Sequence, residues 1–142
     1  MSNLYYIDTC IWLNLFKKEG DESKGRPYWL IAKEFIIKVD KNQEQIYISK
    51  LIIKELYFKL GKDFDKVKQF FKERNFINLV DLTSEDYSLA RTFERTDNYK
   101  ISFYDYLHVA ISQRLDLILI TRDKELINFS KKYIKVQKPE DQ

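Results

Sequence analysis

The residues best suited to do chemistry are four acids from separate stretches of the sequence, Asp8, Glu55, Asp105 and Asp123. If they meet in the fold, they repel one another unless a cation lies between them. Carboxylate oxygens are the ligands that Mg²⁺ and Mn²⁺ prefer, with water and phosphate oxygens completing the coordination. Such a site supports phosphodiester hydrolysis, because the cation activates water and shields the phosphate charge. One cysteine and one histidine do not form the ligand cluster of a zinc site.

Three of these acids also have a simpler interpretation as helix caps. Asp8 and Asp123 each stand where a predicted helix begins. Ser102 and Asp105 have the spacing of a capping box, with Asp where Glu or Gln is usual. Taken singly, each of the three is better explained as a cap. A cap and a metal ligand occupy much the same place at a strand-to-helix edge, so both interpretations stay open.

Glu55 is harder to explain as a surface residue. On a helix its neighbours at −4, −3 and +3 are Leu51, Ile52 and Phe58, which are all apolar. An ionised carboxylate on such a face is costly unless it is paired. A surface ion pair with Lys59 at i+4 is the alternative, but we expect Glu55 to face the core side beside a cation.

Short strands interleaved with helices are predicted to position the acids. Apolar periodicity predicts strands over 4–7, 45–48, 76–80, 117–120 and 133–136. It predicts helices from Asp8 onward and over 27–41, 50–60, 63–74, 84–96, 103–115 and 123–132, with a solvated loop over 19–27. This alternation is typical of an α/β fold with a parallel sheet. In such sheets ligands bind beyond the carboxyl ends of the strands, where Asp8 and Asp123 are expected.

Composition sets broad limits on the class of protein. The 142 residues are predicted to form one domain, residues 1–142, and an apolar content of 44% excludes a disordered chain. The net charge of +3 is too mild to indicate nucleic-acid binding by itself. The single cysteine, the lack of a signal-peptide pattern and the lack of an apolar run near about 20 residues predict a soluble cytoplasmic protein without membrane contact.

Four stretches around the acids resemble the PIN-domain nucleases, especially the compact VapC-type toxins of toxin–antitoxin pairs. The stretches are Tyr-Ile-Asp-Thr-Cys-Ile-Trp at 6–12, Ile-Ser-Lys-Leu-Ile-Ile-Lys-Glu-Leu at 48–56, Ser-Phe-Tyr-Asp-Tyr-Leu-His-Val-Ala at 102–110 and Leu-Ile-Thr-Arg-Asp-Lys at 119–124. They occur in the family's order and span nearly the whole chain. Each stretch alone is weak, whereas four in order form a fairly specific signal.

The resemblance implies a three-layer α/β/α sandwich with a central parallel sheet. It also implies an endoribonuclease that depends on Mg²⁺ or Mn²⁺ and usually acts on single-stranded RNA. By resemblance, the metal ligands are Asp8, Glu55, Asp105 and Asp123. The partners that it implies are RNA, a small antitoxin protein and a second copy of the chain in a homodimer.

Other residues near these stretches are candidates for supporting roles. Thr9, Ser49 and Thr121 fall where the family often has small hydroxyl residues around the site, with helix capping as the alternative. Arg122 stands where the family often has Asn, and it is expected either to contact a phosphate or to be solvated.

For four further side chains we favour a structural role over a role in the site. His108 lies one helical turn after Asp105 and is expected to pack among aromatic side chains rather than to act in the site. Cys10 is expected to face the core, and no second histidine-type base stands near it to make it a nucleophile. Lys50 and Lys54 are expected on a solvated face, with guidance of RNA as the alternative.

Three other functions remain as alternatives. The first is a PIN-domain RNA-processing nuclease that has no antitoxin, and the second is an inactive RNA-binding or assembly module. The third is a phosphatase of the haloacid-dehalogenase type, which also begins with a strand followed by Asp. That family needs a second Asp two residues later, where this sequence has Cys10, so it ranks low.

Overall fold

A five-stranded sheet forms the centre of the molecule in a computed structural model that describes residues 2–20 and 25–141. The strand order is β3-β2-β1-β4-β5, and every neighbouring pair is parallel. The predicted parallel sheet is therefore confirmed. The strands are β1 (Leu4–Ile7), β2 (Gln45–Ser49), β3 (Ile77–Val80), β4 (Ile118–Ile120) and β5 (Val136–Gln137).

Helices follow the strands as the sequence predicts. They are α1 (Thr9–Phe16), α2 (Tyr28–Lys41), α3 (Lys50–Leu60), α4 (Phe64–Lys72), α5 (Ser84–Thr96), α6 (Phe103–Arg114) and α7 (Lys124–Ser130), with 3₁₀ turns η2 (Gly61–Asp63) and η3 (Pro139–Asp141). Their ends carry the expected caps: Ser49 accepts a hydrogen bond from the N–H of Ile52, and Gly61 ends α3 at φ 54°. None of these helices is long and apolar enough to cross a membrane.

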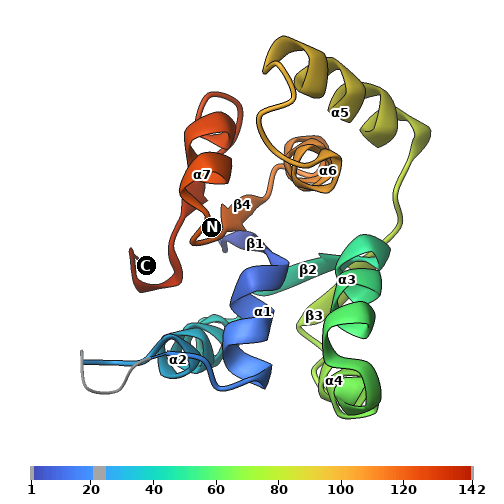
Figure 1. Cartoon of the computed structure of the whole chain (residues 1–142). Coiled ribbons are helices and arrows are strands. Elements are labelled where there is room, and N and C mark those ends of the chain that lie inside the picture. The colour runs from blue at the N-terminus through green and yellow to red at the C-terminus, as the bar shows by residue number, and fades with distance from the viewer. Residues whose placement is uncertain (1, 21–24, 142) are drawn as a thin grey trace.

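The helices form two layers on opposite faces of the sheet. From β1 the chain moves outward to β2 and β3, and then it crosses back to β4 and β5 on the other side. Because parallel crossovers are right-handed, this reversal places α1–α4 on one face and α5–α7 on the other. Figure 1 shows these two helical layers with the strands between them. The three-layer α/β/α sandwich is thereby confirmed.

The core is densest around β1, the central strand. Tyr5, Tyr6 and Ile7 are at most 2% exposed, because helices cover both faces of a parallel sheet. The fully buried Trp12 of α1 packs from one layer, and in the other layer residues 106–112 of α6 are all buried. Buried side chains therefore fix α1 and α6 against the two faces of the central strand.

The structure differs from the sequence-based expectation in three places. The last strand is Val136–Gln137 rather than 133–136, since the N–H groups of Tyr133 and Ile134 bond to the carbonyl of Ser130 in a turn. Phe58, expected on the buried face of α3, is 72% exposed. The predicted loop over 19–27 falls partly outside the described residues, and Pro27 immediately precedes α2 as expected.

Candidate active site

The two central strands carry two of the four acids at their carboxyl ends. Asp8 follows β1 directly, and Asp123 follows β4 by three residues. The N–H of Asp8 donates to the carbonyl of Ile120 at 2.9 Å, which keeps the two strand ends side by side. The chain leaves β1 and β4 toward opposite edges of the sheet, so this is the point where the strand order reverses.

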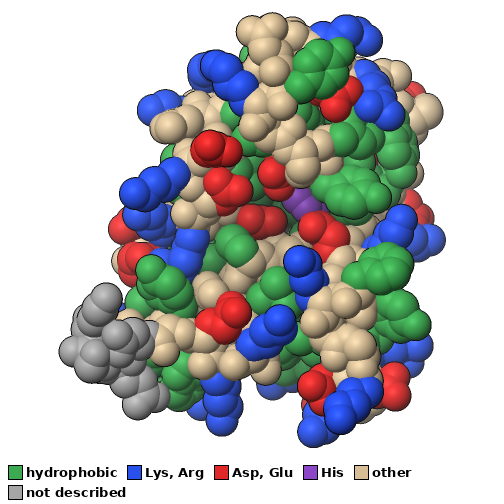
Figure 2. Space-filling model, viewed as in Figure 1, with side chains coloured by type: hydrophobic (Ala, Val, Ile, Leu, Met, Phe, Trp, Pro, Cys, Tyr) green, Lys and Arg blue, Asp and Glu red, His purple; other side chains and the backbone are tan. Residues whose placement is uncertain are grey.

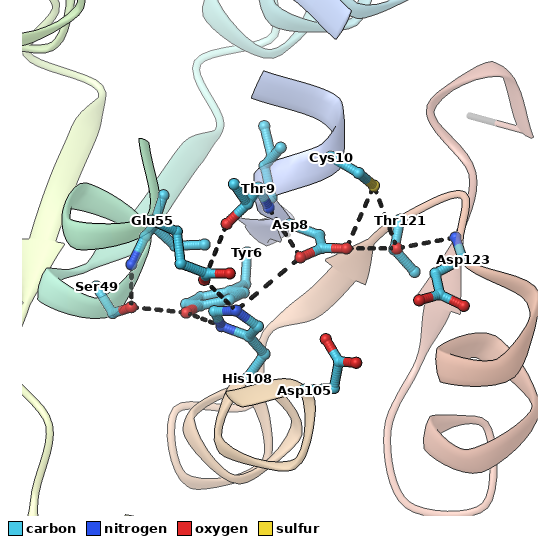
Figure 3. A network of polar contacts seen from close by, with 12 residues as sticks. Tyr6, Asp8, Thr9, Cys10, Ser49, Glu55, Asp105, His108, Thr121 and Asp123 are labelled. Carbon is cyan, nitrogen blue, oxygen red and sulfur yellow. Dashed lines mark hydrogen bonds and ion pairs between the residues drawn. The ribbon is translucent and has the colours of Figure 1, made fainter. Parts of the chain in front are cut away.

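The other two acids come from the two helical layers. Glu55 lies on α3, and Asp105 lies in the first turn of α6 on the opposite face of the sheet. Figure 3 shows the side chains of Asp8, Glu55, Asp105 and Asp123 around one space, each brought by a different element. Acidic side chains also gather at the centre of the face drawn in Figure 2. The structure thus brings together all four acids that the sequence singles out.

Asp8 is buried and held in place by hydrogen bonds to both oxygens. The residue is only 7% exposed to solvent. Oδ1 accepts from the N–H of Thr9 at 2.8 Å, and Oδ2 accepts from the hydroxyl of Thr121 at 2.8 Å. The Thr121 hydroxyl also accepts from the N–H of Asp123 at 3.2 Å. Thr121 therefore links Asp8 with Asp123, as expected of a hydroxyl residue that supports the site.

Asp8 and Asp123 cap helices as predicted, whereas Asp105 does not complete a capping box. Asp123 Oδ1 accepts from the N–H groups of Glu125 and Leu126 at 3.0 and 3.3 Å. Ser102 caps α6 by accepting from the N–H of Asp105 at 3.2 Å, but these two residues do not form the reciprocal backbone bond of a capping box. Two acids are thus both caps and members of the cluster, whereas Asp105 needs another explanation.

Asp105 is harder to ionise than an ordinary aspartate. Burial and the charge of Asp8, with a smaller contribution from Asp123, raise the pKa of Asp105 from 3.8 to about 6. The neighbouring His108 and the hydrogen bond with Ser102 act in the opposite direction. A buried acid that also faces other acids is the state that a bound cation would relieve.

Glu55 is held by one of its two oxygens. Oε1 accepts from the hydroxyl of Thr9 at 3.0 Å and lies 2.9 Å from Nε2 of His108. Its side chain is 26% exposed, so it faces the cluster rather than bulk water. The alternative ion pair with Lys59 does not form among the residues that the structure describes.

His108 is the site neighbour that the sequence interpretation undervalued. It is fully buried, and its Nδ1 lies 2.6 Å from the hydroxyl of Tyr6, which in turn lies 2.8 Å from Oγ of Ser49. Burial disfavours the imidazolium, but the hydrogen bond to Glu55 and the charges of the nearby acids outweigh it and raise the pKa of His108. Its position one turn after Asp105 was the only signal in the sequence.

Cys10 is half-buried and packs against the core as expected, and its thiol also contacts the acid cluster. Its Sγ is 3.3 Å from Oδ2 of Asp8 and 3.6 Å from the hydroxyl of Thr121. Burial, followed by the charge of Asp8, raises the pKa of the Cys10 thiol to about 12. The thiol therefore stays protonated at neutral pH, which agrees with the expectation that it is no nucleophile.

Arg122 contacts side chains other than those of the four acids. Its Nε donates to Oδ1 of Asn14 at 3.3 Å, its Nη1 donates to Oε2 of Glu140 at 2.8 Å, and its guanidinium lies 4.0 Å from the ring centre of Tyr28. Within the described chain it forms no ion pair with any of the four acids. Its contacts to Asn14, Glu140 and Tyr28 leave the phosphate role of Arg122 a prediction.

The four acids suit a hard divalent cation by their chemistry. As the side chains stand, no three His, Cys, Asp or Glu residues within 2–20 and 25–141 are placed to hold one metal ion together. The donors are nevertheless carboxylate oxygens from four segments, and burial together with the charges of Asp8 and Asp123 raises the pKa of Asp105. This donor set fits Mg²⁺ or Mn²⁺ and offers no thiolate for a softer metal.

Comparison with known proteins gives a family and a set of similar folds. A family model described as the PIN domain matches residues 5–132. No curated protein matches the sequence.

Among solved structures, the chain is similar to the VapBC2 complex from Rickettsia felis bound to a DNA fragment from its promoter, with a TM-score of 0.70 at 16% identity over 95% of this chain and 98% of that one. It is also similar to a toxin–antitoxin complex from Klebsiella pneumoniae, with a TM-score of 0.67 at 20% identity over 95% and 97%. DNA-bound VapBC from Salmonella typhimurium gives 0.67 at 15% identity over 98% and 99%. At 15–20% sequence identity, these similarities show a shared fold and no more.

Proposed function

Since the chain belongs to the PIN domain family, whose members are generally nucleases, we propose that it is an endoribonuclease that uses Mg²⁺ or Mn²⁺ to hydrolyse phosphodiester bonds of single-stranded RNA. The observation that carries the proposal is the meeting of four acids from four elements where the strand order reverses. A solvated set of helix caps would not need Asp105 to face two other acids.

Asp8, Glu55, Asp105 and Asp123 would hold the cation. When bound, a divalent cation supplies a more acidic water and shields the charge of the phosphate. The chain's own hydroxyls keep the acids oriented: Thr9 donates to Glu55, and Thr121 donates to Asp8. Both acids are therefore oriented before the substrate arrives, which spares the reaction the cost of ordering them.

The surroundings of the acids favour a nucleic-acid strand as substrate. Lys54 precedes Glu55, Tyr104 precedes Asp105, and the Lys54 ammonium lies 6.0 Å from the centre of the Tyr104 ring. Tyr104 is 42% exposed, so its ring is open to a base. An exposed aromatic ring beside a cation is typical of proteins that bind unpaired strands by stacking and charge. This pair supports a single-stranded substrate.

A cleavage assay tests the proposal. The purified chain should cut a single-stranded RNA when Mg²⁺ or Mn²⁺ is added and stop when EDTA removes the metal. Asp105→Asn should remove the cleavage, whereas the control Asp65→Asn, an exposed position on α4, should not. Cleavage that persists in EDTA contradicts the metal mechanism. Metal binding without cleavage of any RNA favours the inactive RNA-binding module instead.

We further propose that the nuclease is the toxin of a toxin–antitoxin pair and forms a homodimer. The similar structures include complexes that carry toxin and antitoxin in their descriptions. This chain also exposes apolar surface that a partner would cover. We call it the α3–α4 face, and it comprises Ile53, Tyr57, Phe58, Phe64, Ile77 and Leu79, with Lys68 and Lys72 along a groove within it.

The α3–α4 face suits an acidic, amphipathic segment of an antitoxin. Phe58 and Leu79 are 72% and 56% exposed, which is unusual for such large apolar side chains in one region. The two lysines add positive charge beside the apolar groove. Native purification should yield the chain with a small protein whose removal releases nuclease activity. Purification of the active chain alone would favour an RNA-processing nuclease.

A further inference from the structure

A buried chain of hydrogen bonds connects Glu55 with the central strand. It runs from Glu55 on α3 to His108 on α6 (2.9 Å), then to Tyr6 on β1 (2.6 Å) and on to Ser49 at the end of β2 (2.8 Å). His108 and Tyr6 are fully buried, and Ser49 is too. Figure 3 shows the imidazole ring between Glu55 and the Tyr6 hydroxyl. Four elements from all three layers thus meet in one polar chain.

For the neutral ring of His108, the chemistry of the groups sets the direction of these bonds. An ionised carboxylate only accepts, so Nε2 of His108 carries the proton that it donates to Glu55. In the neutral ring Nδ1 then accepts from the hydroxyl of Tyr6, and the Tyr6 oxygen accepts from the hydroxyl of Ser49. Ser49 Oγ also accepts from the N–H of Ile52, which caps α3. The chain therefore ends on the same helix that carries Glu55.

This arrangement fixes one oxygen of Glu55 and leaves the other available. Thr9 and His108 both bond to Oε1. Among the described residues no hydrogen bond or ion pair to Oε2 forms, and the Glu55 side chain as a whole is 26% exposed. A free glutamate side chain samples many rotamers, so bonds to one oxygen reduce the cost of presenting the other to a ligand.

His108 itself has no lone pair directed at the cluster. Nε2 lies 4.0 Å from Oδ1 of Asp8, but it carries the proton donated to Glu55. Nδ1 points the other way and is bonded to Tyr6. The ring therefore acts on the site through Glu55 rather than by direct contact with a cation.

We propose that His108, held by Tyr6 and Ser49, is a positioning residue that fixes Glu55 for binding a divalent cation. The inference rests on the proposed function, because it assumes that the four acids hold a metal. Partners of this kind typically change metal affinity by about 10- to 100-fold when they are removed.

Binding of Mn²⁺ to the purified chain, followed by electron paramagnetic resonance and calorimetry, tests the inference. His108→Leu removes both ring bonds and should weaken Mn²⁺ binding by about 10- to 100-fold. His108→Gln keeps a donor for Glu55 and should restore part of the affinity. Tyr6→Phe keeps the buried ring but removes the bond to Nδ1, and it should weaken binding by a smaller factor. This variant decides the matter if His108→Leu does not fold.

The matched control is Ser112→Ala on the same buried face of α6. Its hydroxyl bonds only to the backbone carbonyl of His108 at 2.8 Å, so its loss perturbs the helix without touching Glu55. It should leave Mn²⁺ affinity unchanged. Equal affinity in wild type, His108→Leu and Tyr6→Phe would overturn the positioning role alone. A directly coordinated nitrogen in the Mn²⁺ spectrum would also overturn it, because His108 would then be a ligand. A wild-type chain that binds no Mn²⁺ would overturn the proposed metal site, and the inference with it.

Discussion

Each acid in the cluster combines a structural duty with a chemical one. Asp8 caps α1 and Asp123 caps α7, yet both face Asp105 across the site. Sequence reasoning could identify all four acids because each stands at a recognisable place beside a strand or in a helix turn. It could not identify the bond between Tyr6 and His108, which lie 102 positions apart, because only the fold brings them together.

Asp105 should make the stability of the metal-free protein depend on pH. The unfolded chain releases this proton near pH 3.8, whereas the folded chain keeps it to about 6. The folded state thus binds more protons in this window, and the free energy of unfolding falls as pH rises through it. Asp105→Asn removes this loss and should raise the free energy of unfolding by ~1–2 kcal/mol at neutral pH, with a smaller gain near pH 4.

Urea unfolding in EDTA at several pH values measures this effect. Asp65→Asn, on the exposed side of α4, is the control and should shift stability little at any pH. A loss of stability in Asp105→Asn at neutral pH would contradict the raised pKa of Asp105.

Cys10 should react slowly with alkylating reagents although it is only half-buried. Burial and Asp8 raise the pKa of its thiol to about 12, so the reactive thiolate is scarce at neutral pH. We expect iodoacetamide to label Cys10 roughly a thousandfold more slowly than a solvated thiol. Mass spectrometry measures the labelling rate. The urea-unfolded chain serves as the internal control, and equal rates in the two states would contradict the raised pKa.

At the scale of elements, the helices and the inner strands could be predicted closely, and the edge of the sheet could not. Inner strands such as β1 show a continuous apolar run because helices cover both faces. The last strand pairs on one side only and has two residues, so the apolar stretch at Tyr133–Val136 predicted it too early. The prediction that Phe58 is buried was wrong because helical spacing shows which residues share a face, but not whether another element covers that face.

An ion pair with a buried acid links α5 with α6. Asp86 is 1% exposed, closes the capping box of α5 and accepts two hydrogen bonds from Arg114 at 2.9 and 3.0 Å. Arg114→Met would leave this carboxylate buried without its cation. We expect a loss of about 2–3 kcal/mol in the free energy of unfolding, since Arg114 is itself partly exposed.

Urea unfolding of three variants checks the assignment. Adding Asp86→Asn to Arg114→Met should recover part of the loss, because the buried charge is then gone. Lys50→Met breaks a pair with Asp81 in which both side chains are exposed, and it should cost at most about 0.5 kcal/mol. An equal cost for Lys50→Met and Arg114→Met would contradict a special role for the buried pair.

At the scale of the whole molecule, the acids and the α3–α4 face share helix α3 but use different side chains of it, so their roles should separate by mutation. Phe58→Ser combined with Leu79→Ser should weaken binding of the proposed antitoxin at least about tenfold, because both side chains are exposed where a partner would cover them. RNA cleavage by the free chain should persist. Calorimetry with the isolated partner measures the affinity.

Ile37 offers the matched control for that experiment. It is 55% exposed on α2, outside the α3–α4 face, and Ile37→Ser should leave binding of the partner unchanged. If Ile37→Ser weakens binding and the double variant does not, the partner covers α2 instead. Light scattering of the same variants shows which substitution changes the mass of the proposed homodimer.

The bond between Arg122 and Glu140 has a practical consequence for handling the protein. It brings the last described turn, η3, to the residue beside Asp123, at the edge of the sheet where the acids gather. The start of β1 lies at the opposite edge, roughly 13 Å away along the strand. A polyhistidine tag at the carboxyl end would therefore place imidazoles next to the acids and compete for Mn²⁺. A tag at the amino end should leave the measured Mn²⁺ affinity equal to that of the untagged chain.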